Sequence, residues 1–201
     1  MSPAYVAIID SGGANIASLL YALKRLNTKA TLTTDAAVIS AADRVILPGV
    51  GAARDAMTRL RDGHLIDVIR QLTQPVLGIC LGMQLLVDAS EEEDVECLGI
   101  IPGTAKKLPG NTSCPVPNMG WCPITRIAEH AVLSELGDGT YFYFLHSYAV
   151  PTSQHTVATA QHANPFSAVV SHENFVAAQF HPERSSVAGE QLLRNFIGLR
   201  Q

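Results

Sequence analysis

The first half of the chain alternates short apolar runs, rich in β-branched residues, with longer amphipathic stretches. Strands are predicted at 5–10, 29–34, 44–50 and 75–80. Helices are predicted at 15–26, 52–72 and 81–90, where apolar residues recur at helical spacing. Strands and helices that alternate in this way form right-handed βαβ units around a mostly parallel sheet.

The second half has a different texture, because strand-like runs follow one another with only turn residues between them. These runs lie at 99–108, 119–127, 141–150, 155–163, 166–172 and 174–180. A last amphipathic helix is predicted at 186–199. We therefore expect an α/β fold, with an open, mostly parallel sheet flanked by helices and an added antiparallel β layer.

The domain organisation is predicted to be simple. No linker, internal repeat or low-complexity segment divides the chain, so residues 1–201 are expected to form a single domain. The acidic run at 91–94 is interpreted as a solvated loop.

Composition and charge exclude several classes of protein. A net charge of -4 gives no electrostatic basis for binding nucleic acid. The chain lacks a signal peptide and any stretch of ~20 apolar residues, so we expect a cytoplasmic protein with no membrane contact. Its four cysteines form no C-x-x-C pair, which favours reduced thiols over a zinc site or a disulfide framework. No metal or cofactor is expected.

One cysteine stands between two glycines where a strand is predicted to give way to a helix. Gly78, Cys80 and Gly82 form Gly-x-Cys-x-Gly, the thiol counterpart of a nucleophile elbow, in which a sharp turn needs neighbours without a Cβ. The helix N-terminus favours a thiolate, and the Leu81 N–H is expected to face a developing oxyanion. A buried core cysteine beside two packing glycines is the alternative.

A second predicted strand ends on a histidine and a glutamate. Proline after His181 favours extended geometry, which would send the His181 and Glu183 side chains to the same side. The imidazole would then act as a base that the carboxylate orients. The alternative is a surface turn. The other six histidines lack a comparable carboxylate two residues on.

A third strand end offers backbone donors. Residues 48–51 read Pro-Gly-Val-Gly before a predicted helix, so the N–H groups of Gly49, Val50 and Gly51 are candidates for an oxyanion hole. The alternative is a plain βα turn.

Taken together, "DSGGANI", "PGVG", "GICLGMQ", "MGW", "FLHSY" and "QFHPERS" resemble the class I, triad-type glutamine amidotransferases over nearly the whole length. Within that family the chain is similar to the glutaminases of histidine biosynthesis. The resemblance implies a catalytic triad of Cys80, His181 and Glu183 that hydrolyses glutamine to glutamate and ammonia through a thioester. It also implies that glutamine is held by Gly51, Gln84, Ser147 and Tyr148.

The resemblance further implies a separate partner, a (βα)8-barrel cyclase that uses the ammonia to make imidazole glycerol phosphate and the aminoimidazole carboxamide ribonucleotide. Candidate interface residues are Asn15, Met119, Trp121, Tyr143 and Arg184. For Trp121 and Tyr143 buried aromatic packing is the alternative, and Asn15 is also expected to cap the first helix. The chain departs from the usual pattern of the family at Ala14, Ala53, Asn118 and Cys122.

Two rival functions stay open from the sequence. One is a glutaminase that serves another synthase, such as one for pyridoxal phosphate or anthranilate. The other is a non-catalytic scaffolding subunit that keeps the fold without the activity.

Overall fold

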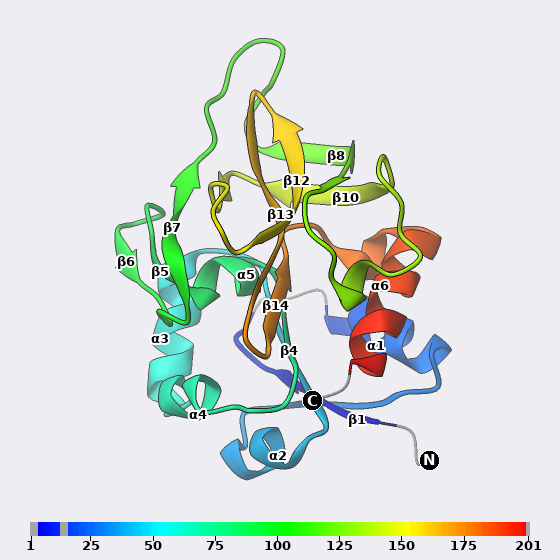
Figure 1. The fold of residues 1–201 in the computed structure, drawn as a ribbon. Helices are drawn as coiled ribbons and strands as arrows, with labels where there is room; N and C mark the ends of the chain where they lie inside the picture. Colours follow the sequence, from blue (N-terminus) through cyan, green and yellow to red (C-terminus); the bar gives the residue numbers. More distant parts are fainter. Residues whose placement is uncertain (1–3, 13–15, 200–201) are drawn as a thin grey trace.

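The computed structural model describes residues 4–12 and 16–199, which are organised around one large twisted sheet (Figure 1). The sheet has eight strands in the order β2-β1-β3-β4-β14-β13-β12-β9. Neighbours from β2 to β14 run parallel, and those from β14 to β9 run antiparallel. The strands are β1 (Tyr5–Ile9), β2 (Lys29–Thr33), β3 (Arg44–Gly49), β4 (Val76–Cys80), β9 (Thr125–Arg126), β12 (Thr156–His162), β13 (Asn164–His172) and β14 (Phe175–Ala178).

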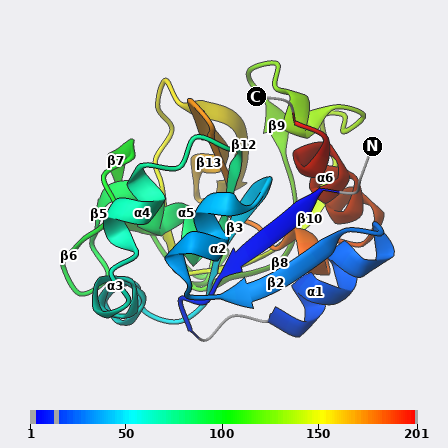
Figure 2. The same ribbon diagram turned by 90° about the horizontal axis from the view of Figure 1, so that it is seen from below.

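Helices cover both faces of the parallel part. On one face lie α1 (Ile16–Arg25) and α6 (Ser186–Gly198), while α2 (Ala36–Ala41), α3 (Ala53–Asp62), α4 (Ile66–Arg70) and α5 (Leu81–Leu86) lie on the other (Figures 1 and 2). Strand β1 shows the cause, because Val6 and Ile8 enter one hydrophobic cluster while Ala7 and Ile9 enter the other. A strand buried on both faces is typical of a parallel sheet. The predicted α/β class is confirmed.

Two smaller sheets form the added β layer. One has the order β11-β7-β5-β6, with β5 (Val87–Ser90), β6 (Val95–Glu96), β7 (Ile101–Lys107) and β11 (Tyr148–Ala149). The other pairs β8 (Asn118–Pro123) with β10 (Tyr141–His146) in antiparallel register. Two 3-10 turns, η1 (Ala131–Leu133) and η2 (Pro182–Arg184), complete the elements of the described residues.

Three local predictions were wrong or incomplete. Residues 87–90 form strand β5 rather than the end of a helix, because they pair with β7, far along the chain. The helix predicted at 52–72 is two helices, since Gly63 ends α3 and His64 takes a left-handed φ of 54°. Helix α2 was missed, although Asp35 caps it by accepting the N–H groups of Ala37 and Val38.

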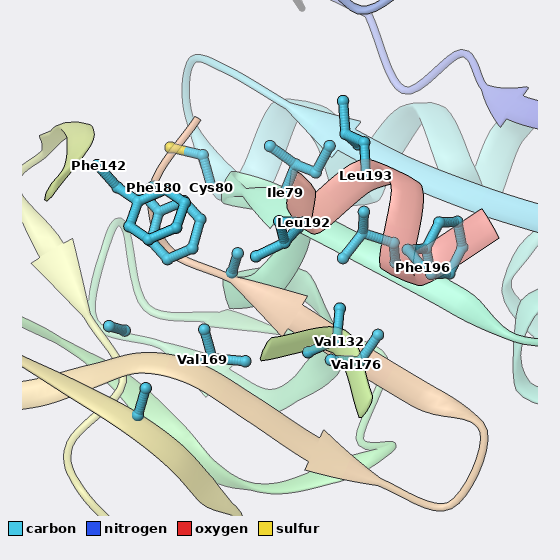
Figure 3. Close-up of a cluster of buried hydrophobic side chains, with 14 of the residues drawn as sticks. Ile79, Cys80, Val132, Phe142, Val169, Val176, Phe180, Leu192, Leu193 and Phe196 are labelled. Carbon is cyan, nitrogen blue, oxygen red and sulfur yellow. The ribbon is translucent and has the colours of Figure 1, made fainter. Parts of the chain in front are cut away.

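The cluster on the α6 side of the sheet extends from the helix to the sulfur of Cys80. Phe142 and Phe180 stack with ring centroids 3.9 Å apart, and Leu192, Leu193 and Phe196 of α6 fill the other end. Figure 3 shows Cys80 at one end of this cluster, beside the two stacked rings. The strand that carries the thiol is therefore anchored in well-packed core.

Within residues 4–12 and 16–199, no helix combines the length and apolar character needed to cross a bilayer.

Candidate active site

Cys80 is the last residue of β4 and has an unusual backbone conformation. Its φ of 54° and ψ of -109° lie outside the regions that L-residues favour, as expected for a strained nucleophile turn. A Cβ built on Gly82 would lie 1.8 Å from the Leu47 carbonyl oxygen. A Cβ on Gly78 would lie 2.9 Å from Leu86 Cδ1 and 3.0 Å from Ala177 Cβ. Both glycines are thus required by close packing around the turn.

The histidine and glutamate come from the neighbouring strand. Strand β14 pairs in parallel with β4, so His181 emerges beside Cys80 at the same edge of the sheet. His181 is extended, as its proline neighbour predicts, and η2 then folds Glu183 back until its Oε1 lies 2.9 Å from His181 Nδ1. The contact therefore arises from a 3-10 turn, and not from a continued strand.

The pair is buried, with each side chain 5% exposed. Burial by itself lowers the pKa of His181, but the Cys80 thiol and the Glu183 carboxylate outweigh it and raise the pKa of the imidazole well above its usual range. Glu183 occupies Nδ1, which leaves Nε2 as the ring nitrogen for the thiol. His181 is thus placed to exchange a proton with the Cys80 thiol through Nε2.

Ser185 fixes the turn that carries both groups. Its Oγ donates to the His181 carbonyl (2.6 Å) and accepts from the Tyr143 N–H (2.9 Å). The His181 N–H in turn donates to the Tyr143 carbonyl (2.9 Å). Sequence reasoning missed Ser185, and its position inside "HPERS" is the only signal the chain offers.

A cavity of about 340 Å³ opens in front of the sulfur. Its wall includes nine of the predicted site residues: Val50, Gly51, Cys80, Leu81, Gln84, Ser147, Tyr148, His181 and Arg184. Gly49 is not part of the wall but lies beside Cys80 in the sheet, as its partner in the β3–β4 register. The size of the cavity suits a small polar molecule.

Residues 91–94 form an exposed turn, as predicted, except that Glu92 also lines this cavity. The turn between β5 and β6 exposes its neighbours but directs Glu92 inward, and Glu92 Oε2 accepts from the N–H of Ala53 at 2.9 Å. The inward position of Glu92 cannot be predicted from the sequence, because nothing distinguishes this glutamate from the other acidic residues of the run.

Two glutamine side chains form a chain of contacts behind the sulfur. Gln84 Nε2 donates to the Tyr148 carbonyl (2.8 Å) and to Gln179 Oε1 (3.1 Å). Gln179 Nε2 lies 3.8 Å from Cys80 Sγ. Gln179 is fully buried and was missed; a polar residue in the apolar run before "FHPE" is its signal.

His146 lines the cavity as a neutral ring, although sequence reasoning set it aside. Its Nδ1 lies 2.9 Å from the Tyr148 carbonyl, and its Nε2 lies 3.0 Å from Asn118 Nδ2. Burial lowers its pKa to about 4. Asn118, one of the departures from the family pattern, thus holds the segment that contains Ser147 and Tyr148.

Strands β8 and β10 expose a row of large side chains, Met119, Trp121, Tyr141 and Tyr143, which we call the exposed ridge. Met119 is 68% exposed and Trp121 is 52% exposed, so buried packing does not explain Trp121. Tyr143 is half-buried between the edge of Trp121 (centroids 6.2 Å apart) and the guanidinium of Arg184, 4.3 Å above its ring. Tyr141 was missed.

Ala14 and Asn15 lie outside the described residues. All four cysteines are free, and the described part of the chain holds no cluster of three or more His, Cys, Asp or Glu side chains suited to a metal ion.

Comparisons with known proteins identify the family. The glutamine amidotransferase class-I family matches residues 7–199. A protein from Pasteurella multocida named imidazole glycerol phosphate synthase subunit HisH is 48% identical over 192 residues, which cover 96% of each chain. A protein of the same name from Xanthomonas euvesicatoria is 49% identical over the same length and coverage.

A solved structure agrees at the level of the fold. The crystal structure of a glutamine amidotransferase superposes with a TM-score of 0.74, at 17% identity, over 96% of this chain and 99% of that chain. The chain therefore belongs to the class-I glutamine amidotransferases and, within them, to the HisH subunits of imidazole glycerol phosphate synthase.

Proposed function

We propose that the chain hydrolyses glutamine to glutamate and ammonia with Cys80, His181 and Glu183, and passes the ammonia to a (βα)8-barrel cyclase in histidine biosynthesis. The observation that carries this proposal is the thiol on a strained turn, beside a buried His181–Glu183 pair, at the wall of a half-open cavity.

The first half-reaction forms a thioester. The Cys80 thiolate attacks the side-chain amide carbon of glutamine, and the C–N bond breaks as the imidazolium of His181 gives its proton to the departing nitrogen. Ammonia leaves and the glutamyl group stays on sulfur. Glu183 keeps the ring oriented and stabilises its charge throughout.

The second half-reaction consumes water. Once sulfur is acylated, His181 is neutral and no longer faces a thiolate, so it can take a proton from water as the oxygen attacks the thioester. The C–S bond breaks, the proton passes to sulfur, and glutamate is released. The balance needs only glutamine and water, so the proposal includes no metal or cofactor.

Backbone N–H groups stabilise the negative oxygen in both steps. Leu81 at the start of α5 supplies one, and the 49–51 segment supplies the other from Gly49, Val50 or Gly51. Gly51 has a φ of 95°, a conformation that is unfavourable for residues with a side chain. Val50, Gly51 and Leu81 line the cavity with Cys80, and Gly49 lies beside Cys80 in the sheet.

The rest of the cavity holds the amino-acid end of glutamine. Gln84, Ser147 and Tyr148 bind it by hydrogen bonds from the wall, and the Glu92 carboxylate attracts the α-ammonium group, because opposite charges pair strongly in a partly enclosed site.

The cyclase binds at the exposed ridge and Arg184, where large apolar side chains stand in water. Asn15 belongs to the same proposed interface. The whole chain, 1–201, acts as one glutamine amidotransferase domain. The reaction is assigned to the cytoplasm, where four free cysteines stay reduced.

The test is glutamate release by the chain alone, with the cyclase, and with the cyclase and its nucleotide substrate. We expect release to rise when the partner and its substrate are present. Absence of release in all three mixtures would leave a scaffolding role, and activation by a different synthase would reassign the partner.

A further inference from the structure

Gln179 lies directly behind the nucleophile and has no access to substrate. It follows β14, its side chain is 0% exposed, and its N–H donates to the Ala168 carbonyl at 2.9 Å. An amide buried this deeply is costly unless each polar atom finds a partner. Its partners are Gln84 and Cys80.

The direction of the Gln179 amide follows from its neighbours. The Tyr148 carbonyl can only accept, so the Gln84 atom 2.8 Å from it must be nitrogen. The same nitrogen lies 3.1 Å from Gln179, which must therefore present its oxygen to Gln84. The Gln179 nitrogen is then the atom that faces Cys80 Sγ at 3.8 Å.

The sulfur thus contacts one backbone carbonyl and one side-chain amide, which have opposite effects on the balance between thiol and thiolate. The Leu145 carbonyl, 3.7 Å away, can only accept a hydrogen bond and so favours the protonated thiol. The Gln179 amide can only donate at that position and so favours the thiolate. Without the Gln179 amide, the Leu145 carbonyl would still favour the thiol, and this amide would no longer oppose it.

We propose that Gln179 is a positioning residue that stabilises the thiolate of Cys80 through its amide N–H, with Gln84 holding that amide in the donating direction. The proposal rests on the proposed role of Cys80 as nucleophile. It also couples the Tyr148 segment of the substrate pocket to the reactivity of the thiol, because Gln84 contacts both.

The cavity wall also contains other ionisable side chains, and a test of Gln179 must leave these residues unsubstituted. They are Glu92, His146, Tyr148, His181 and Arg184. None of them is changed by a substitution at position 179.

The experiment measures the rate at which iodoacetamide alkylates Cys80 in the full-length chain, as a function of pH, with the modified cysteine identified by mass spectrometry. Gln179→Met removes the donor at nearly constant volume. Gln179→Asn is the second variant, since it keeps an amide but withdraws it by one methylene. Gln74→Met is the matched control, because Gln74 is also buried and its amide donates to the carbonyls of Ile39 and Ser40, away from Cys80.

We expect both Gln179 variants to move the midpoint of the alkylation profile to higher pH, so that Cys80 reacts about tenfold more slowly on the acid side of the midpoint. The plateau rate at high pH should stay unchanged, and the Gln74 variant should show the wild-type midpoint. In glutaminase assays of the complex, kcat should fall by more than KM changes.

A wild-type midpoint in both Gln179 variants overturns the proposal, whatever happens to their melting temperatures. Alkylation uses no glutamine, so this result is independent of whether the chain is a glutaminase. Absence of glutaminase activity in the wild-type complex would instead count against the proposed function.

Discussion

The turn that carries Cys80 and the exposed ridge on β8 and β10 are built by opposite rules. Around the turn the packing is tight, because a Cβ at position 82 would overlap the Leu47 carbonyl. Along the ridge, Met119 is 68% exposed and Trp121 is 52% exposed, so neither side chain is closely surrounded. The chemistry thus resides in the core, whereas the surface that we assign to the partner leaves large apolar side chains in water. The predictions below separate the two regions.

Cys80→Ala is expected to have the largest effect on activity. Removal of a nucleophile typically lowers turnover by at least about 10⁴-fold, because no other group can form the thioester. Synthesis from added ammonium salts by the complex should be nearly unchanged, since ammonia then needs no release. Failure with ammonium as well would indicate that Cys80 is structural.

Gly82→Ala is expected to have the largest effect on folding. The added carbon would lie 1.8 Å from a backbone oxygen that belongs to the central strand β3, so relief requires movement of the sheet. We expect the free energy of unfolding to fall by more than about 4 kcal/mol, measured by urea denaturation. Gly137→Ala, at a glycine with open space around it, is the control and should change stability little.

Glu183→Gln should retain more glutaminase activity than His181→Ala. Orientation of an imidazole contributes less than the imidazole itself, by about 10- to 100-fold in comparable triads. The comparison requires kcat for both variants in the activated complex. Equal residual activities would contradict the separate roles assigned to the two side chains.

The pH dependence of stability should show the raised pKa of His181. The folded protein holds this proton more tightly than the unfolded chain, so the stabilisation is complete below about pH 6.5 and is lost as pH rises through the higher folded pKa. Each tenfold difference in proton affinity corresponds to about 1.4 kcal/mol. Urea midpoints between pH 7 and 10 should therefore fall more steeply for the wild type than for His181→Gln, and parallel curves would refute this origin.

Trp121→Ala should have the smallest effect on the chain alone. Trp121 is 52% exposed, so we expect the free energy of unfolding to change by no more than about 0.5 kcal/mol. Affinity for the cyclase should fall by at least about tenfold, because exposed aromatic residues commonly dominate such interfaces. Ile127→Ala, equally exposed at 54% but away from the ridge, should leave affinity unchanged. Affinity that falls equally in both variants would remove Trp121 from the interface.

The sequence predicts most strongly those features that depend on local rules. Alternation of strands and helices indicated the sheet, and glycines around Cys80 indicated the turn, because backbone sterics act over a few residues. Strand β5 escaped prediction because its pairing with β7 is a tertiary event. Glu92 and Gln179 escaped for the same reason, since their neighbours at Ala53 and Gln84 are distant in sequence.

The pairing of β4 with β14 has a consequence for the order of folding. Val76 lies beside Phe175, so the strand that carries the nucleophile gains its second neighbour only when the last part of the chain is in place. Strands β1 to β4 can associate earlier, since parallel pairing among them needs no later residue. During synthesis on the ribosome, β4 would then be a transient edge strand with an ordinary, unactivated cysteine. Thiol reactivity at Cys80 thus measures completion of the fold, and a kinetic alkylation trace during refolding would time the insertion of β14.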